Sequence, residues 1–210
     1  QSHVRAAVVE TIQELVPKLP ESPELLCLTA PTDGLWLVDA AGTPIRPAIL
    51  PTDRRAAAYP ADWHLHPIFS AVYRRAGYAL GPASQASLLR WLLDHEPESI
   101  DRAATAFSAK DALLHWLTGA RVTDITDASA PFLDLRSRTF DEELVDLLRL
   151  RPIRHLLPPI DPATGSLWPL SDAGARATGM PAGMAVHAGP FDAIATGLGA
   201  GLQGTGDAFI

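Results

Sequence analysis

Apolar residues recur at three-to-four spacing in several stretches of the chain, and this spacing predicts amphipathic helices. The first predicted helix covers residues 3–16 and ends before Pro17 and Pro20. The same pattern predicts helices over 66–77, 84–97, 108–119 and 141–150, and a short one from Ser171. Ser84 is the expected N-cap of its helix and Gly119 the expected C-cap of the helix that it follows.

Short apolar runs bounded by turn residues predict the strands. We expect strands over 24–30 ("ELLCLTA") and 184–188 ("MAVHA"), and a strand with a turn over 129–140. Residues 34–50 are expected to form a hairpin around "DAAGTP", followed by a loop with short helical turns over 51–63. Strands mixed with helices indicate an α/β fold, with hairpins early and strand-helix units later.

The composition narrows the class of protein. The chain has 210 residues, 47% hydrophobic and 20% charged, which is typical of an ordinary folded domain. Its net charge of −7 and its scattered basic residues argue against nucleic-acid binding. No apolar run approaches the roughly 20 residues that span a membrane. The single cysteine, Cys27, stands in an apolar run and is expected to be a buried thiol, so we predict a cytoplasmic protein.

Three kinds of site are poorly supported by the sequence. His64 and His66 are the closest histidine pair, but no second pair has zinc spacing, so a structural or surface role is favoured. Gly197, Gly199 and Gly201 fall more than a turn into a helix, where close packing explains them better than nucleotide binding does. The sequence also contains no GxSxG motif, which argues against a serine hydrolase.

Asp192 follows the predicted strand 184–188 and the turn "GPF", at or near the start of a helix. One interpretation is an N-cap that accepts backbone N–H bonds. The other is a functional carboxylate, because ligands of α/β folds bind beyond the carboxyl ends of strands. The two interpretations are compatible, and the local sequence does not decide between them.

Two further carboxylates, Asp33 and Asp53, each follow an apolar strand. Turn chemistry is the simpler explanation, with Asp33-Gly34 as a turn pair and Asp53 capping a helix. The alternative is a rim of carboxylates and hydroxyls that binds several hydroxyl groups of a sugar or polyol. Its members would be Thr32, Asp33, Thr52 and Asp53.

Taken in order, three segments resemble the FGGY family of carbohydrate kinases. They are "TAPTDGLWLVDAAGTPIRPAILPTDRRA", "LLRWLLDHEPESIDRAATAFSAKDALLHWLTGARVTDITDASAPFLDL" and "GARATGMPAGMAVHAGPFDAIATGLGAG". No single motif is decisive, but their order and spacing match the family over nearly the whole chain. The resemblance implies an actin-like, ribonuclease-H-like fold with a mixed sheet and flanking helices, in which sugar and ATP bind between two domains.

The resemblance also implies roles for particular residues. Asp192 matches the family's catalytic aspartate, which accepts the proton of the attacking hydroxyl. Thr32, Asp33, Asp53 and Ala193 match substrate-binding positions. A carboxylate that orients a hydroxyl suits phosphoryl transfer, which depends mainly on positioning and charge neutralisation. The implied cofactors are ATP and Mg²⁺ and the implied partner is a sugar or polyol, with a homodimer left open.

Several positions depart from the family's pattern. Thr32 and Asp33 replace an Arg-Glu pair of glycerol kinases and a Met-His pair of xylulokinases. Pro51 replaces a tryptophan, Ala83 a tyrosine, and Ala193 a glutamine or asparagine. The smaller side chains predict a roomier pocket, in which Asp33 bonds a pair of hydroxyls. The "GPFDAIATGLGAG" form leans towards erythritol and L-xylulose kinases.

Residues 1–210 are expected to form most of the family's N-terminal, sugar-binding domain. The first phosphate-binding hairpin would lie before Gln1 and the ATP-binding domain after Ile210, so this polypeptide alone is expected to be inactive. The sequence leaves two functions open. One is ATP-dependent phosphorylation of a pentulose or related polyol, and the other is a non-catalytic sugar-binding or regulatory protein that retains the fold.

Overall fold

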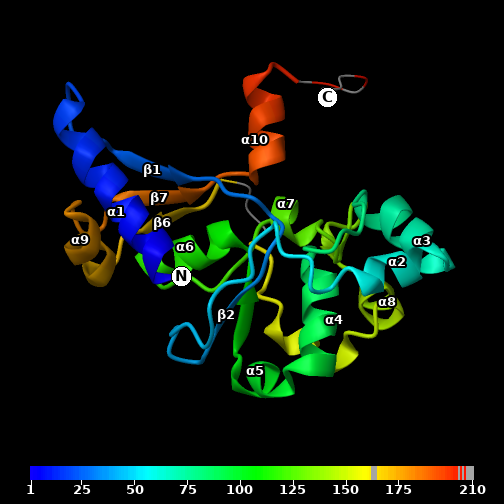
Figure 1. The fold of residues 1–210 in the computed structure, drawn as a ribbon. Coiled ribbons are helices and arrows are strands. Elements are labelled where there is room, and N and C mark those ends of the chain that lie inside the picture. Colours follow the sequence, from blue (N-terminus) through cyan, green and yellow to red (C-terminus); the bar gives the residue numbers. More distant parts are fainter. Residues whose placement is uncertain (162–164, 203, 205, 207–210) are drawn as a thin grey trace.

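A computed structural model describes residues 1–161, 165–202, 204 and 206. One part of the molecule is built around a three-stranded sheet with the order β1-β7-β6 (Figure 1). Its strands are β1 (Leu25–Leu28), β7 (Ala185–Ala188) and β6 (Leu167–Pro169). β1 runs parallel to β7, with Leu28 opposite Ala188, whereas β6 runs antiparallel to β7. The carboxyl ends of β1 and β7 therefore lie at the same edge of the sheet.

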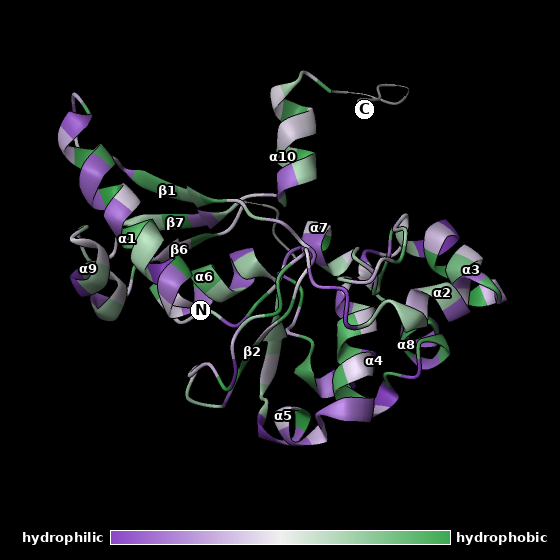
Figure 2. Cartoon of the chain, viewed as in Figure 1, coloured by the Kyte–Doolittle hydropathy of each residue, from purple (hydrophilic) through white to green (hydrophobic). Residues whose placement is uncertain are grey.

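Three helices gather around this sheet (Figure 1). They are α1 (Ser2–Leu15), α6 (Ala109–Thr118) and α9 (Asp172–Thr178). Figure 2 shows hydrophilic and hydrophobic residues alternating along α1. This pattern is expected where polar and apolar residues occupy different faces of a helix. The core that these elements share includes Leu113, Leu114 and Leu117 of α6 and Val186 of β7. The partly buried Val4, Val8 and Ile12 of α1 pack against it.

A second group of elements packs around a larger apolar core. Its short sheet pairs β2 (Trp36–Val38) with β3 (Thr105–Phe107), and β4 (Leu133–Asp134) pairs with β5 (Thr139–Phe140). The helices are α2 (Ala58–His64), α3 (Pro67–Ala76), α4 (Gln85–His95), α5 (Pro97–Arg102), α7 (Ile125–Ala128) and α8 (Glu142–Leu147). The 3₁₀ helix η2 (Arg151–Leu156) belongs to this group, whereas the 3₁₀ helix η1 (Val16–Lys18) continues α1 in the first group.

Helix α10 (Asp192–Gly199) begins at the carboxyl end of β7 and projects away from both groups (Figure 1). Its apolar residues Ile194 and Leu198 are exposed. Within the described residues, none of the helices has the length and apolar character that crossing a membrane requires.

The predicted helix caps are confirmed, although the helices predicted over 84–97 and 141–150 are shorter, at Gln85–His95 and Glu142–Leu147. The side chains of Ser84 and Ser171 accept bonds from the backbone of Ser87 and Gly174, and Gly119 ends α6 with φ of +83°. These signals are local, because a cap depends on residues within one turn of it.

The hairpin expected over 34–50 is formed only in part. The turn is present, since Asp39 accepts the backbone N–H of Thr43, and the two arms meet at isolated bridges. The regular partner of β2, however, is β3, about 70 positions away, which the apolar pattern did not indicate.

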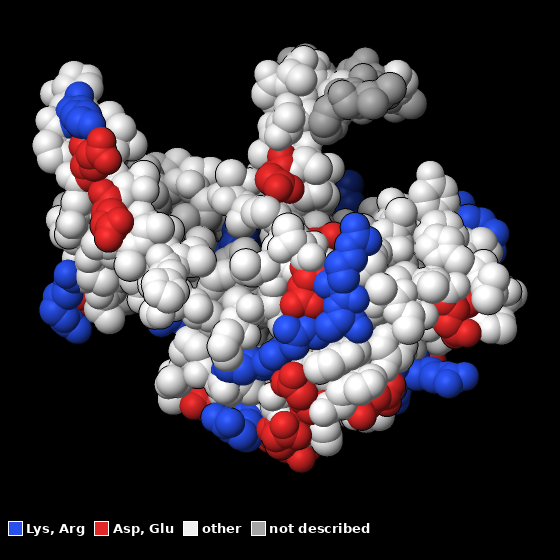
Figure 3. All heavy atoms as spheres, in the orientation of Figure 1, with Lys and Arg blue, Asp and Glu red and all other residues white. Residues whose placement is uncertain are grey.

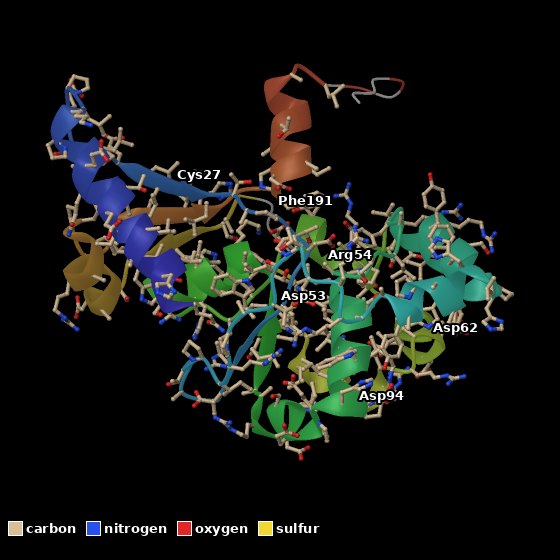
Figure 4. The ribbon with its side chains drawn as sticks, in the orientation of Figure 1. Cys27, Asp53, Arg54, Asp62, Asp94 and Phe191 are labelled. Carbon is tan, nitrogen blue, oxygen red and sulfur yellow. The ribbon has the colours of Figure 1, made fainter. Side chains whose placement is uncertain are left out.

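The expectation that Cys27 is buried is wrong, because its side chain is exposed (Figure 4). Successive side chains of a strand point to opposite faces of the sheet. Leu26 and Leu28 contact the core, so Cys27 lies on the other face of β1. An apolar run therefore identified the strand but not which of its faces is covered.

Candidate active site

Asp192 is the first residue of α10, and hydrogen bonds tie its loop to the loop after β1. The amide of Gly189 donates to the Leu28 carbonyl at 2.9 Å, and the amide of Asp192 donates to the Ala30 carbonyl at 3.1 Å. The Thr29 hydroxyl donates to the Pro190 carbonyl at 2.8 Å. The loops that follow two parallel strands thus form one structure, in the place where ligands bind in open α/β sheets.

The N-cap interpretation of Asp192 is corrected by this geometry. Phe191 holds the N-cap position, and its side chain makes no capping bond. Asp192 Oδ1 instead accepts the N–H of the next residue, Ala193, at 2.7 Å. The side chains of Asp192 and Ala193 are both exposed, so the carboxylate stands at the positive end of the helix dipole and faces solvent.

The loop after β1 places Asp33 against a half-buried tyrosine. The Tyr78 hydroxyl donates a hydrogen bond to Asp33 Oδ1. Burial of the tyrosine, together with the nearby Asp33 carboxylate, raises the pKa of Tyr78. Tyr78 therefore remains a neutral donor that holds Asp33 in one orientation.

Thr32 points the other way, into the protein. Its hydroxyl is shielded from solvent and makes no hydrogen bond of good geometry. It lies close enough to the Asp127 carboxylate to lower the pKa of that group against the stronger, raising effect of burial. Thr32 thus supports the loop from beneath rather than facing the hollow beside Asp33.

Three members of the predicted rim of carboxylates and hydroxyls, Asp33, Thr52 and Asp53, lie together around one hollow. A hollow of about 330 Å³ is lined by Asp33, Pro51, Thr52, Asp53, Arg54, Pro82 and Ala83. Pro51 and Ala83, the positions where the sequence departs from bulkier residues, both border it. Thr32, Asp192 and Ala193 do not line this hollow. Figure 4 shows Asp53 and Arg54 beneath the base of α10, where Phe191 is labelled.

Asp53 does not cap a helix as expected, but it does make the side-chain bond of a turn. Its Oδ1 accepts the backbone N–H of Arg55 at 2.9 Å and the side-chain Nε at 3.0 Å, and its Oδ2 accepts Nη2 at 3.0 Å. This two-pronged bond from Arg55 is the main cause that lowers the pKa of Asp53. A sequence of Asp-Arg-Arg allows the carboxylate to be satisfied locally, so no following helix is needed.

Basic groups beside the rim were not predicted from the sequence. Figure 3 shows basic and acidic side chains adjoining one another below α10. Arg54 lines the hollow, while Arg55 pairs with Asp53 and lies over the Trp91 ring at 5.0 Å. The pair "RR" that follows Asp53 was the available signal, but its neighbours across the fold are not visible in the sequence.

A buried ionic cluster lies behind these loops, and sequence reasoning missed it. The Lys110 ammonium is fully buried and contacts Asp111 at 3.2 Å, Asp127 at 2.9 Å, and Asp124. The available signal was a Lys-Asp pair on a helix that is otherwise apolar. The oxygens of these three carboxylates lie close enough together to ligate a metal ion. The Lys110 ammonium already contacts each of these carboxylates, so among the described residues their negative charge is balanced by a lysine.

The cluster predicts a specific dependence of stability on pH. Burial, and then the Asp127 charge, raises the pKa of Asp111 to about 7, despite the opposing effect of Lys110. Between the unfolded pKa of about 4 and this value the folded protein holds a proton that the unfolded chain releases. The contribution of Asp111 to stability is therefore lost as pH rises through this window. We therefore expect the free energy of unfolding, measured with urea, to fall less for Asp111→Asn than for wild type when the pH is raised from 5 to 8.

Asp101→Asn is the matched control, because Asp101 is exposed on α5. Its pH dependence should follow that of the wild type. Equal pH dependence of Asp111→Asn and wild type would show that Asp111 is ionised throughout the window.

Two remaining predictions concern residues outside the site. The structural or surface role favoured for the histidine pair agrees with their contacts. His64 Nδ1 lies 2.5 Å from the Pro60 carbonyl and its ring stacks on Phe69, whereas His66 lies beside Asp62. Of the three glycines expected within one helix, Gly201 lies beyond the end of α10, with φ of +91°. The expected close packing is wrong for Gly199 and Gly201. A Cβ added to Gly199 or Gly201 would meet nothing within 4 Å in the described part of the chain, although Gly197 is buried.

The α/β domain with its mixed sheet and flanking helices shares its fold with solved carbohydrate kinases. The sequence matches the FGGY family of carbohydrate kinases, N-terminal domain, over residues 2–199. The chain therefore belongs to the FGGY family, and the predicted fold class is confirmed.

Curated and solved relatives agree with this assignment. An erythritol kinase of Brucella abortus is 34% identical over 189 residues, which cover 90% of this chain and 36% of the relative. A probable L-xylulose kinase of Pasteurella multocida is 31% identical, covering 88% of this chain and 38% of the relative. The structure of a xylulose kinase from Rhodospirillum rubrum superposes with a TM-score of 0.79 at 30% identity, covering 89% of this chain and 38% of that one. The chain thus spans little more than a third of these proteins.

Proposed function

We propose that this chain is the sugar-binding part of an enzyme that transfers a phosphoryl group from ATP to a hydroxyl of a pentulose or related polyol. The observation that supports this most is the joining of the β1 and β7 loops, which puts Asp192 beside the loop that carries Asp33. Family membership and the erythritol and L-xylulose kinases among its relatives favour the same substrate class.

In the proposed reaction Asp192 accepts a hydrogen bond from the attacking hydroxyl. As the new O–P bond forms and the bond to the departing ADP breaks, the hydroxyl proton passes to the Asp192 carboxylate. Asp33, Thr52 and Asp53 bind other hydroxyls of the substrate and fix its orientation. The carboxylates act mainly by positioning, which is what phosphoryl transfer requires.

ATP and Mg²⁺ are the proposed cofactors, and the residues of this chain fit them at one point. In this proposal the Asp192 carboxylate, which is exposed at the head of α10, would stand beside the phosphoryl group that is transferred. Bound Mg²⁺ would neutralise phosphate charge. Of the two lysines, Lys110 is buried among carboxylates and Lys18 pairs with Glu14, so neither is proposed as a phosphate ligand.

A coupled assay of ADP release by the full-length protein tests this function. Mg-ATP would be combined with tetritols, pentitols, pentuloses, glycerol and hexuloses. We expect turnover on tetritols or pentuloses. Sugar binding seen by calorimetry without any ADP release would favour the alternative, a non-catalytic binding protein whose altered pocket no longer supports transfer.

Tyr78 provides a test of the substrate-binding role of Asp33. We expect Tyr78→Phe to raise the KM for the sugar about threefold to tenfold, because Asp33 loses the hydrogen bond that orients it. The value of kcat should change less, since Asp192 is untouched. Steady-state kinetics measures both.

Tyr73→Phe is the matched control, because it removes the same hydroxyl from an exposed tyrosine of α3. Its KM should equal that of the wild type. An unchanged KM in Tyr78→Phe would argue against a role of Asp33 in holding the substrate.

A further inference from the structure

The start of α10 is held mainly by polar contacts. Hollows of about 390 Å³ and 410 Å³ flank it, and Thr126 and Ile194 border both. Side chains therefore do not pack tightly against the base of this helix on either side. Among the described residues, its position depends on the hydrogen bonds of residues 189–192.

One of these hydrogen bonds is accepted by α7, which lies directly beneath the base of α10 (Figure 1). The amide of Phe191 donates to Thr126 Oγ1 at 3.1 Å. The Phe191 amide belongs to the peptide bond between Pro190 and Phe191, one bond before the peptide that leads into Asp192, whose own amide donates to the Ala30 carbonyl. The contact with Thr126 therefore fixes the backbone immediately before Asp192.

The Thr126 hydroxyl is itself oriented by a carboxylate. It lies 2.5 Å from Asp124 Oδ1, which also accepts the backbone N–H of Thr126 at 2.6 Å. An ionised carboxylate only accepts hydrogen bonds. The hydroxyl proton therefore points to Asp124, and a lone pair is left facing the Phe191 amide.

Asp124 is anchored in turn by the buried cluster. Its second oxygen, Oδ2, contacts the Lys110 ammonium. The same ammonium binds Asp127, which lies against Thr32 in the loop that carries Asp33. A single buried lysine thus supports both loops of the proposed active site.

We propose that Thr126 is a positioning residue for Asp192. Its hydroxyl, oriented by the Lys110–Asp124 ion pair, holds the Phe191 amide and so sets where the Asp192 carboxylate stands. This inference rests on the proposed function, because it assigns Thr126 to the same reaction. Thr126 does not touch the substrate in this scheme and acts only through Asp192.

The test compares Thr126→Val and Thr126→Ser in the full-length protein, with Mg-ATP and the best substrate of the panel. Valine keeps the shape of threonine without the hydroxyl, and serine keeps the hydroxyl. We expect Thr126→Val to lower kcat about 10- to 100-fold, as a small misplacement of a catalytic group does, with KM changed less than about threefold. Thr126→Ser should stay within about threefold of wild type. Thr11→Val, an exposed threonine of α1, controls for the substitution itself.

A double variant separates positioning from a general structural role. If Thr126 acts through Asp192, Thr126→Val added to Asp192→Asn will slow the residual rate by less than about threefold. Amide hydrogen exchange gives a readout without turnover, since the Phe191 amide should exchange at least about tenfold faster in Thr126→Val. Thr126→Ala replaces the valine variant if that variant does not fold.

Three results would overturn the inference: a kcat of Thr126→Val within about threefold of wild type, a serine variant as slow as the valine variant, or losses that multiply in the double variant. If the wild type turns over, Asp192→Asn abolishes the turnover and Thr126→Val does not change it, this inference is contradicted and the proposed function is not. A wild type that turns over no member of the panel would remove the proposed function and this inference together.

Discussion

Asp192→Asn in the full-length protein is expected to lower kcat for sugar phosphorylation about 10²- to 10⁴-fold, the usual contribution of a positioned acid-base group. Asparagine keeps the size of the side chain and the acceptor that bonds the Ala193 amide at 2.7 Å. It does not take up a proton. The loss should therefore appear in kcat, with the KM for the sugar changed much less.

The structure offers a close control for this substitution. Asp172 is the first residue of α9, as Asp192 is of α10, and both are exposed. Asp172→Asn thus removes the same favourable charge from a helix N-terminus, which costs about 0.3–1 kcal/mol in either variant. The two variants should have similar melting temperatures and differ only in turnover. Turnover of Asp192→Asn within about tenfold of wild type would argue against a catalytic base at this position.

Features set by neighbouring residues were predictable from the sequence. The caps at Ser84 and Ser171 and the left-handed Gly119 depend on bonds within a single turn, so the local pattern is enough. The position of Asp192 after a strand was also predictable. Its proposed role as the base came from the order of three family-like segments rather than from any local feature.

Features set by contacts between distant segments were not predictable. The strand β3 has three residues, and its apolar character has meaning only beside β2. Whether Cys27 is buried depends on which face of β1 is covered, and Cys27 lies on the exposed face. Lys110 and Asp127 resemble surface charges of helices when they are read alone, because their ion pair and their burial exist only in the folded protein.

The same cluster gives the largest expected effect on stability. Lys110→Met is expected to lower the free energy of unfolding by about 3–5 kcal/mol, the usual cost of leaving buried charges without a partner. Methionine fits the space of the lysine stem, so loss of packing is small. The cost arises because three carboxylates remain close together, two of them with side chains only 2% exposed.

The pH dependence of this loss identifies its origin. Without the ammonium, the cheapest way to relieve the repulsion is to protonate the carboxylates, whose pKa values burial already raises for Asp111 and Asp127. The deficit of Lys110→Met should therefore be smaller at pH 5 than at pH 8 in urea unfolding. Lys18→Met is the control, since Lys18 is exposed and pairs only with Glu14 across one helical turn, and it should cost less than about 1 kcal/mol. A deficit that is equal at both pH values would attribute the loss to packing rather than to charge, and would weaken the link between this lysine and the loops of the active site.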